Sequence, residues 1–268
     1  MKVVCVLFSQ TDVSRNVMKI FRNNYNRNLL EKKVNKFIEP LRADYEKNQK
    51  KIIEICHVGK FLSLLNNEIN INRIFEEPDF ILNDGNKIIG LEHQVIINTG
   101  KIQIEGFYKN IFQKVEIKIQ NEYPEYKFLA NCYLKNNLLV ELSRKEYLIN
   151  EIYETVIEFL RSNILNDNEI IEDILVLPHK KVRLSTNFGG WTQKFISEDV
   201  IYSAINKKEK KISNYIDNCG KRQWLLMVIG GLGETSYEMD ENLKLSFDSK
   251  FDEIYIIEDF NNVLYKIK

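Results

Sequence analysis

The feature that most constrains the fold of this chain is a pair of apolar, β-type runs on either side of a tight turn, within residues 78–95. The turn is Asp84-Gly85, and glycine readily adopts the positive φ that short hairpin turns require. Asp79 opens the first run, and Glu92 lies near the end of the second. A hairpin brings the outer ends of its two strands together, so we expect these two carboxylates to lie side by side.

Each of these carboxylates also has an ordinary structural interpretation. Asp79 could be a turn aspartate satisfied by backbone amides, and Glu92 could face solvent from a half-exposed strand. The neighbours of Glu92 on its own strand face are Gly90 and Gln94, which leave a polar face with room for a ligand. Paired carboxylates held on strands are the hard oxygen ligands that Mg²⁺ prefers. The pair therefore favours metal-assisted cleavage of a phosphodiester bond.

Composition narrows the classes of function. The chain has 268 residues, of which 44% are hydrophobic, so it can bury a sizeable core. Lys and Arg together number 38, as do Asp and Glu, and the formal net charge is zero. A protein that coats nucleic acid without selectivity is usually strongly basic. The charge balance therefore argues against that class, but not against a local basic cleft.

The cysteines and the apolar segments indicate a reducing compartment and no membrane. The four cysteines lie far apart and form no Cys-x-x-Cys pair, which argues against a zinc site. Residues 1–8 are apolar but too few for a signal peptide, and no apolar run reaches the length of a membrane span. We therefore expect a cytoplasmic protein with no membrane partner.

Hydrophobic spacing predicts an α/β chain in which strands alternate with helices. Helical spacing occurs at residues 13–36, 43–66, 104–121, 141–165 and 198–215. Besides the hairpin, strand-like runs occur at residues 3–8, 126–134, 173–177, 182–185, 223–229, 253–257 and 263–267. The run at 223–229 is almost continuously apolar, which is typical of a central strand covered on both faces. We expect a mixed sheet with helices on both sides, and no second domain.

The hairpin also carries the signature of a known group of nucleases. Pro-Asp, followed about a dozen residues later by Glu-x-Lys, is the motif of the PD-(D/E)xK superfamily, which this chain resembles. The matching residues are Pro78-Asp79 and Glu92-His93-Gln94. The resemblance covers residues 45–260 approximately and implies a restriction-endonuclease-like mixed β-sheet flanked by helices. Residues 1–44 would then be an N-terminal strand and helical extension, and residues 45–268 the nuclease-like domain.

The chain departs from the motif at its last position, where Gln94 stands in place of lysine. In the superfamily that lysine contacts or polarises the attacking water, although some restriction enzymes with Gln or Glu at this position remain active. A lysine from another segment could also supply the missing charge. The candidates, none of which the sequence singles out, are Lys87, Lys109, Lys114, Lys207, Lys208 and Lys211.

The resemblance implies a set of metal ligands and a catalytic role for the glutamine. Asp79, Glu92 and the backbone carbonyl of His93 would hold Mg²⁺ or Mn²⁺. Such a metal lowers the pKa of a bound water and neutralises the charge that develops on the scissile phosphate. Gln94 would orient that water by hydrogen bonding.

Two other positions near the motif carry predictions. A carboxylate from the helix before the motif often joins such sites, and Glu54 is our candidate, with Glu68 as the alternative. Exposure to solvent is the ordinary role of both. The side chain of His93 should point away from Glu92, because side chains alternate along a strand. We expect that imidazole to be packed or hydrogen-bonded rather than to act as a general base.

Basic and aromatic residues outside the motif are candidates for nucleic-acid binding. Lysines gather on the predicted helices, and a tryptophan lies in a glycine-containing loop from which it could stack on a base. Solvated helix faces and a core-anchoring tryptophan are the ordinary interpretations of the same residues. The candidates are Lys109, Lys114, Trp191, Lys194, Lys207, Lys208 and Lys211.

We therefore expect an endonuclease that depends on Mg²⁺ or Mn²⁺ and acts on a nucleic acid, with DNA favoured over RNA as its substrate. The resemblance implies a setting in bacterial defence or a mobile element. Cleavage of both strands would require a homodimer or a partner protein, since one site cuts one strand. The alternative is a catalytically inactive nuclease fold that binds nucleic acid or a protein partner, which Gln94 and the neutral charge would allow. A small-molecule α/β enzyme has no support, because the sequence contains no cofactor motif.

Overall fold

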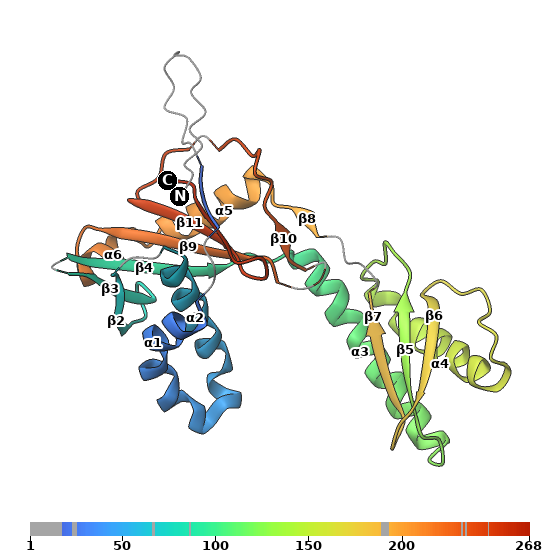
Figure 1. The fold of residues 1–268 in the computed structure, drawn as a ribbon. Coiled ribbons are helices and arrows are strands. Elements are labelled where there is room, and N and C mark those ends of the chain that lie inside the picture. Colours follow the sequence, from blue (N-terminus) through green and yellow to red (C-terminus); the bar gives the residue numbers. More distant parts are fainter. Residues whose placement is uncertain are drawn as a thin grey trace. The chain divides into compact units, whose positions relative to one another are not determined.

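The computed structural model describes residues 18–22, 26–65, 68–85, 87–188, 193–231, 233, 235–245 and 247–268 (Figure 1). The chain forms two compact units. Unit 1 comprises Met1–Ile96, Lys194–Gly231 and Tyr237–Lys268, and unit 2 comprises Ile97–Gln193 and Leu232–Ser236. From the sequence we expected one domain over residues 45–268. The segments of unit 2 share the hydrophobic spacing of those in unit 1, so the sequence pattern does not mark where one unit ends.

Unit 1 is built on a seven-stranded mixed sheet, which confirms the predicted mixed α/β class. Its strands are β1 (Lys19–Phe21), β2 (Asn70–Ile74), β3 (Phe80–Asp84), β4 (Lys87–Val95), β9 (Gln223–Ile229), β11 (Glu253–Glu258) and β12 (Val263–Lys266). The strand order is β1-β12-β11-β9-β4-β3-β2. β4 and β11 pair with β9 in parallel, and the other neighbours are antiparallel. A separate parallel pair joins β8 (Lys194–Phe195) to β10 (Tyr237–Glu238).

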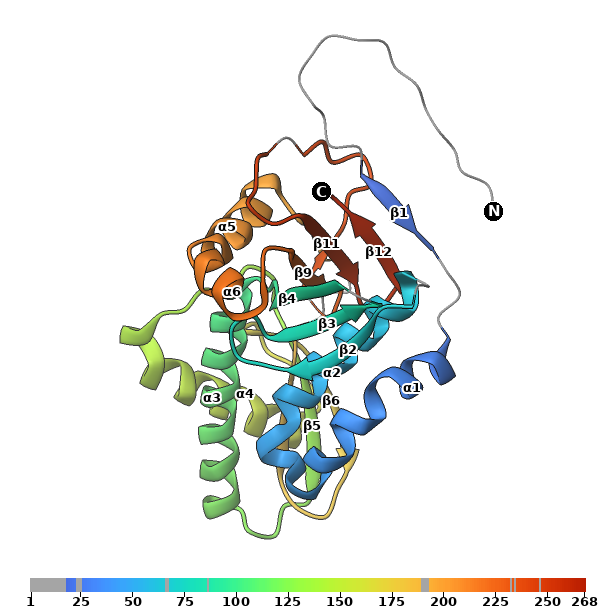
Figure 2. The same ribbon diagram turned by 90° about the vertical axis from the view of Figure 1, so that its left-hand side faces the viewer.

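Helices cover both faces of this sheet (Figure 2). One face packs against α1 (Arg27–Ile38), the 3-10 helix η1 (Glu39–Asp44) and α2 (Tyr45–Leu65), and the other packs against α5 (Glu198–Glu209) and α6 (Ile212–Cys219). The central strand β9 is buried along its whole length. Its side chains alternate between the two cores: Trp224, Leu226 and Val228 face the α1–α2 side, and Leu225, Met227 and Ile229 face the α5–α6 side.

The predicted hairpin is formed by β3 and β4. Gly85 occupies the turn with a φ of 62°, which glycine tolerates because it has no Cβ. The register pairs Phe80 with Leu91. Asp79 and Glu92 each lie one residue further out along their own strand, so the register places them at the same end of the hairpin.

Two predicted helices have different boundaries in the structure. The helix expected over residues 198–215 is two helices, α5 and α6, with a turn at Lys210 and Lys211 between them. The helical spacing over residues 13–36 was also misleading, because Lys19–Phe21 pairs with β12 as a strand and α1 begins only at Arg27. Sheet pairing there overrides the local spacing. The strand predicted at residues 3–8 lies outside the described residues.

Unit 2 contains a three-stranded sheet with the order β6-β5-β7. Its elements are α3 (Thr99–Glu122), β5 (Phe128–Leu134), the 3-10 helix η2 (Leu142–Arg144), α4 (Lys145–Ser162), β6 (Ile171–Pro178) and β7 (Arg183–Asn187). β6 runs antiparallel to β5, and β7 runs parallel to it. Alternate residues of β5 are buried and join the apolar faces of α3 and α4 in the core of this unit.

None of the helices in the described part of the chain combines the length and the apolar character that a bilayer crossing needs.

Candidate functional site

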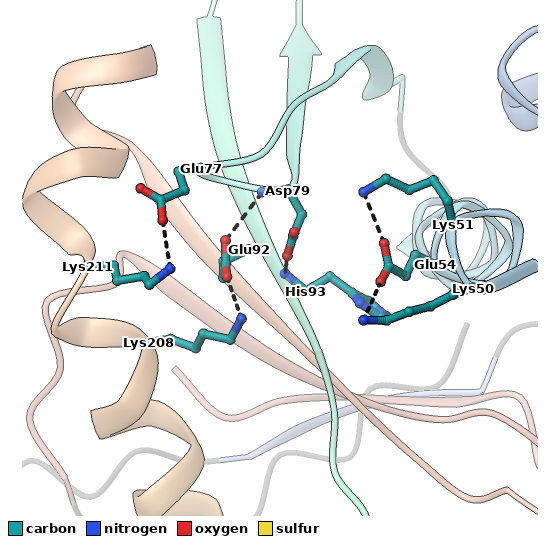
Figure 3. A network of polar contacts seen from close by, with 9 residues as sticks. All are labelled: Lys50, Lys51, Glu54, Glu77, Asp79, Glu92, His93, Lys208 and Lys211. Carbon is teal, nitrogen blue, oxygen red and sulfur yellow. Dashed lines mark hydrogen bonds and ion pairs between the residues drawn. The ribbon is translucent and has the colours of Figure 1, made fainter. Parts of the chain in front are cut away.

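Asp79 and Glu92 contact each other at the open end of the β3–β4 hairpin (Figure 3). The backbone N–H of Asp79 donates to Glu92 Oε2 at 3.3 Å, and the backbone N–H of His93 donates to Asp79 Oδ2 at 2.9 Å. Each carboxylate is therefore held by a backbone amide of the other strand. The sequence pattern predicted this meeting, and the strand register produces it.

Burial and the repulsion between the two carboxylates raise the pKa of Asp79. Removal from water disfavours the ionised form of Asp79, and the nearby negative charge of Glu92 disfavours it further. Together they raise the pKa of Asp79 to about 6, against the opposing effects of the His93 N–H bond and of Lys208. Two carboxylates in this state gain from a further cation, which is the electrostatic setting of a metal site.

Two lysines from the α5–α6 segment reach the same end of the hairpin. Lys208, in the last turn of α5, places Nζ 2.5 Å from Glu92 Oε1. Lys211, which precedes α6, places Nζ 2.6 Å from Glu77 Oε1. Both were among the lysines that we considered from the sequence, but only the helix register and the turn between α5 and α6 show where their ammonium groups point.

Glu77 is a residue that we did not predict from the sequence. Besides Lys211, its carboxylate accepts a hydrogen bond from Asn214 Nδ2 at 3.2 Å, and its backbone carbonyl accepts one from Asn218 Nδ2 at 2.6 Å. These contacts fasten the segment just before Asp79 to α6. The signal available in the sequence was the position of Glu77 directly before the Pro-Asp pair.

One polar atom near Glu92, the buried Oε1 of Gln94, has no protein partner within the described residues. Gln94 shares its strand face with Glu92. The hydroxyl of Tyr215 also lies beside Glu92, and its pKa is raised by burial, by the charge of Glu92 and by a hydrogen bond with that carboxylate. Buried polar atoms are nearly always hydrogen-bonded, so Gln94 Oε1 fits a site that takes water or another polar ligand.

The side chain of His93 lies on the opposite side of β4, as strand alternation predicts. Its Nε2 lies 3.1 Å from Nδ1 of His57 on α2, and the two rings stack with centroids 5.3 Å apart. Burial, followed by the effect of His57, lowers the pKa of His93 to about 3, and burial also lowers the pKa of His57. Both imidazoles are therefore neutral at pH 7, and only the backbone of His93 can serve the carboxylate pair.

The structure does not bring Glu54 to Asp79 and Glu92. The Glu54 carboxylate lies 3.0 Å from Lys51 Nζ and 4.0 Å from Lys50 Nζ, on the side of β4 to which His93 points (Figure 3). Among the described residues, no three His, Cys, Asp or Glu side chains come close enough together to hold a metal ion. A metal at this site would therefore rest on two carboxylates and a backbone carbonyl. The alternative candidate, Glu68, is exposed just before β2.

The remaining lysine candidates have other neighbours or are exposed. Lys109 and Lys114 are on α3 in unit 2, where they face Glu105 and Glu146 respectively. Lys194 and Lys207 are exposed, and Lys87 lies opposite Asp84 in the strand register at the turn end of the hairpin. Trp191 lies outside the described residues. Of the seven residues predicted to bind nucleic acid, Lys208 and Lys211 are those that the structure places beside the carboxylates.

Comparison of the chain with protein-family models, with curated proteins and with solved structures finds no match. The functional assignment therefore rests on the geometry of this site.

Proposed function

We propose that this chain is a nuclease that depends on Mg²⁺ or Mn²⁺ and has a restriction-endonuclease-like active site in unit 1. Asp79, Glu92 and the backbone carbonyl of His93 hold the metal in this proposal. Lys208 takes the place of the lysine that the motif lacks at Gln94. The substrate we propose is DNA, cut endonucleolytically, with a homodimer or a partner protein supplying the second site for cleavage of both strands.

One observation carries the proposal: a carboxylate pair and a lysine meet at the end of a hairpin with the Pro-Asp and Glu-x-Gln pattern. Lys208 comes from a helix 116 residues further along the chain, yet its ammonium group reaches Glu92. A lysine beside the second carboxylate is what the motif normally places two residues after it. The charge that Gln94 cannot supply is therefore present in the site.

The residues of the chain have separable roles in this proposal. The metal, when bound, acidifies an attacking water and neutralises charge on the phosphate. Gln94 accepts a hydrogen bond from that water at its free Oε1 and so orients it. Lys208 holds a phosphate oxygen and stabilises the extra negative charge of the transition state. The neutral imidazoles of His57 and His93 pack between α2 and β4 and transfer no proton.

The test is incubation of the purified protein with plasmid DNA, single-stranded DNA and RNA in Mg²⁺ or Mn²⁺. We expect metal-dependent cleavage of DNA. Asp79→Asn and Glu92→Gln should each reduce the rate by at least about a hundredfold, because loss of a ligand removes several kcal/mol of transition-state stabilisation. Lys208→Met should also abolish cleavage.

Glu54→Gln is the matched control, since it removes a carboxylate on the other side of β4. We expect it to cleave DNA at close to the wild-type rate. Full activity of Asp79→Asn and Glu92→Gln would refute the proposed site, as would activity that persists after removal of divalent metal. Preferential cleavage of RNA would keep the site and change the substrate.

A second function is favoured by the Lys208–Glu92 ion pair itself. Because Lys208 already neutralises Glu92, the fold could bind nucleic acid or a protein partner without catalysis. The two functions differ in their need for metal. Calorimetric titration with Mg²⁺ decides between them, since the nuclease must bind the ion through Asp79 and Glu92 and the inactive module need not.

A further inference from the structure

Both oxygens of the Glu92 carboxylate are already engaged by groups of the protein. Oε1 faces the ammonium group of Lys208 at 2.5 Å, and Oε2 accepts the backbone N–H of Asp79 at 3.3 Å. Glu92 is itself almost fully buried, so little space around it is open to solvent. A cation that binds Glu92 must therefore take over the position that Lys208 occupies, or share an oxygen with it.

We propose that Lys208 is an internal competitor for the metal and that metal entry releases it toward the substrate. This inference rests on the proposed function and concerns the regulation of that same site. In the metal-free state the ammonium group serves as the counterion of Glu92. A divalent ion carries twice the charge and displaces it, and the freed ammonium group then faces a phosphate at the same end of the hairpin.

The position of Lys208 allows this exchange. The side chain of Lys208 is 21% exposed, whereas that of Glu92 is 5% exposed, so the lysine side chain borders solvent and the carboxylate does not. It lies in the last turn of α5, directly before the turn that leads into α6. A lysine ammonium on a four-carbon stem reorients without movement of the backbone. The exchange therefore needs a rotamer change rather than a rearrangement of the helix.

Metal binding and phosphate binding become coupled as a result. While the ammonium group of Lys208 is paired with Glu92, it cannot bind a phosphate, and it occupies the position that the metal would take. After the exchange, the site contains both the metal and a free lysine. Occupation by metal should therefore raise the affinity for phosphate groups, and phosphate groups should raise the affinity for metal by the same factor.

Lys211 provides a matched control for the direct contact. It is also a cation near the carboxylate pair and interacts electrostatically with both Asp79 and Glu92. Its bonded partner, however, is Glu77, and its side chain is 55% exposed. Removal of Lys211 removes a positive charge from the neighbourhood but leaves the Lys208–Glu92 pair intact. A purely long-range effect would act in both variants, whereas competition acts only through Lys208.

The experiment is calorimetric titration of the full chain with Mg²⁺, without nucleic acid, at pH 8. This pH lies above the pKa of Asp79, so protons do not compete for the site. We expect Lys208→Met to bind Mg²⁺ at least about tenfold more tightly than the wild type. In this variant no ammonium group contacts Oε1 of Glu92, so that oxygen is available to the metal. Lys211→Met should tighten binding by less than about threefold, since its charge acts through solvent.

Circular dichroism checks that each variant is folded, and Lys208→Gln replaces Lys208→Met if the methionine variant is not. If the wild type binds Mg²⁺ and the folded Lys208 variant binds it equally or more weakly, the competitor role is refuted while the proposed nuclease stands. If both lysine variants tighten binding equally, the effect is long-range and the competitor role is again refuted. If neither the wild type nor any variant binds Mg²⁺, the proposed metal site itself fails.

Discussion

Strand β4 buries one titratable side chain on each of its two sides, and the two differ in their charge. Glu92 and His93 are adjacent residues with 4% and 6% of their surface exposed, respectively. Glu92 faces the α5–α6 side and meets the ammonium group of Lys208. His93 faces α2 and meets the imidazole of His57. The α5–α6 side therefore retains a buried ion pair, whereas the two buried imidazoles on the α2 side are neutral.

The difference follows from what each side chain can do when it leaves water. Burial disfavours the charged form of any group, and an imidazole avoids that cost by giving up its proton at neutral pH. The Glu92 side instead supplies a counterion from another helix, which keeps a charged group available for chemistry. In the proposed function, the α5–α6 side would bind the metal and the phosphate, and the α2 side would hold the strand in place. Six single substitutions, one of them a control, test this contrast.

The largest effect is expected from Lys208→Met. Without metal, this change leaves the buried Glu92 carboxylate without its cation. We expect a loss of about 3 kcal/mol in the free energy of unfolding, which is typical when one partner of a buried ion pair is removed. Urea denaturation at pH 7 measures it. The double variant Lys208→Met/Glu92→Gln should lose less than the sum of the two single changes, and simple additivity would show that the pair is not coupled.

Gly90→Ala should have the next largest effect, because it pushes α6 away from β4. A Cβ at Gly90 would lie 2.1 Å from Oε1 of Gln223 and 2.6 Å from Sγ of Cys219. Gln223 binds the end of α6 through the carbonyls of Tyr215 and Gly220. We expect a destabilisation of about 2 kcal/mol, as is common for overpacking.

Gly106→Ala is the control for that change. Gly106 lies on α3, and a methyl group added there would meet open space. The change should raise the free energy of unfolding slightly, because alanine favours a helix more than glycine does. Thermal unfolding compares the two alanine variants. Equal melting temperatures for both would show that Gln223 yields to the new methyl group without moving α6.

A smaller effect is expected in the pH dependence of stability. His93 has a pKa of about 3 in the folded chain and an ordinary value of 6.5, so the unfolded chain takes up its proton first as pH falls. The contribution of His93 to the free energy of unfolding should therefore fall as pH falls below 6.5. Because His93→Gln removes this contribution, it should reduce the drop between pH 6.5 and 5.5 by about 1 kcal/mol. Chemical denaturation at the two pH values measures the difference.

Asp79 works in the opposite direction over part of the same range. Its pKa is raised from 3.8 to about 6, so the folded chain takes up this proton first and gains stability as pH falls from 6 toward 3.8. Asp79→Asn removes that gain and should make the acid loss steeper. A flatter profile for Asp79→Asn than for the wild type would contradict the assignment of charge to the two sides of β4.

The smallest effect is expected from Lys211→Met. Lys211 pairs with Glu77 near the surface, where solvent and salt screen the attraction. We expect a barely measurable change in stability, which should vanish at high salt. A loss as large as that of Lys208→Met would show that the fastening of Glu77 to α6 contributes as much as the buried pair.

Much of the fold and half of the candidate site could be predicted from local sequence pattern. A tight turn between two strands predicts the hairpin and brings Asp79 next to Glu92. The alternation of side chains along a strand predicts that His93 points to the opposite side from Glu92. The continuous apolar run of β9 predicted its burial on both faces. These features depend on residues close together in the sequence, whose relative positions are set by the geometry of a strand or a turn.

The predictions that failed depend on segments far apart in the chain. Helical spacing at residues 198–215 did not reveal the turn at Lys210–Lys211, because the same side chains satisfy one long helix or two short ones. Position on a preceding helix suggested Glu54, but the rotation of α2 turns that carboxylate toward Lys50 and Lys51. Neither the break in a helix nor its rotation against a sheet is encoded in hydrophobic period alone.

The sequence by itself determined the β3–β4 hairpin, the buried strand β9 and the meeting of the two carboxylates, because strand geometry and turn chemistry are local. Only the tertiary structure decided which lysine joins them. Lys207, Lys208, Lys210 and Lys211 are nearly equivalent as sequence, and packing of α5 and α6 against the sheet selects Lys208 for Glu92 and Lys211 for Glu77. The physical reason is that a buried charge selects a partner by distance in space, which the sequence order of lysines on a helix does not specify.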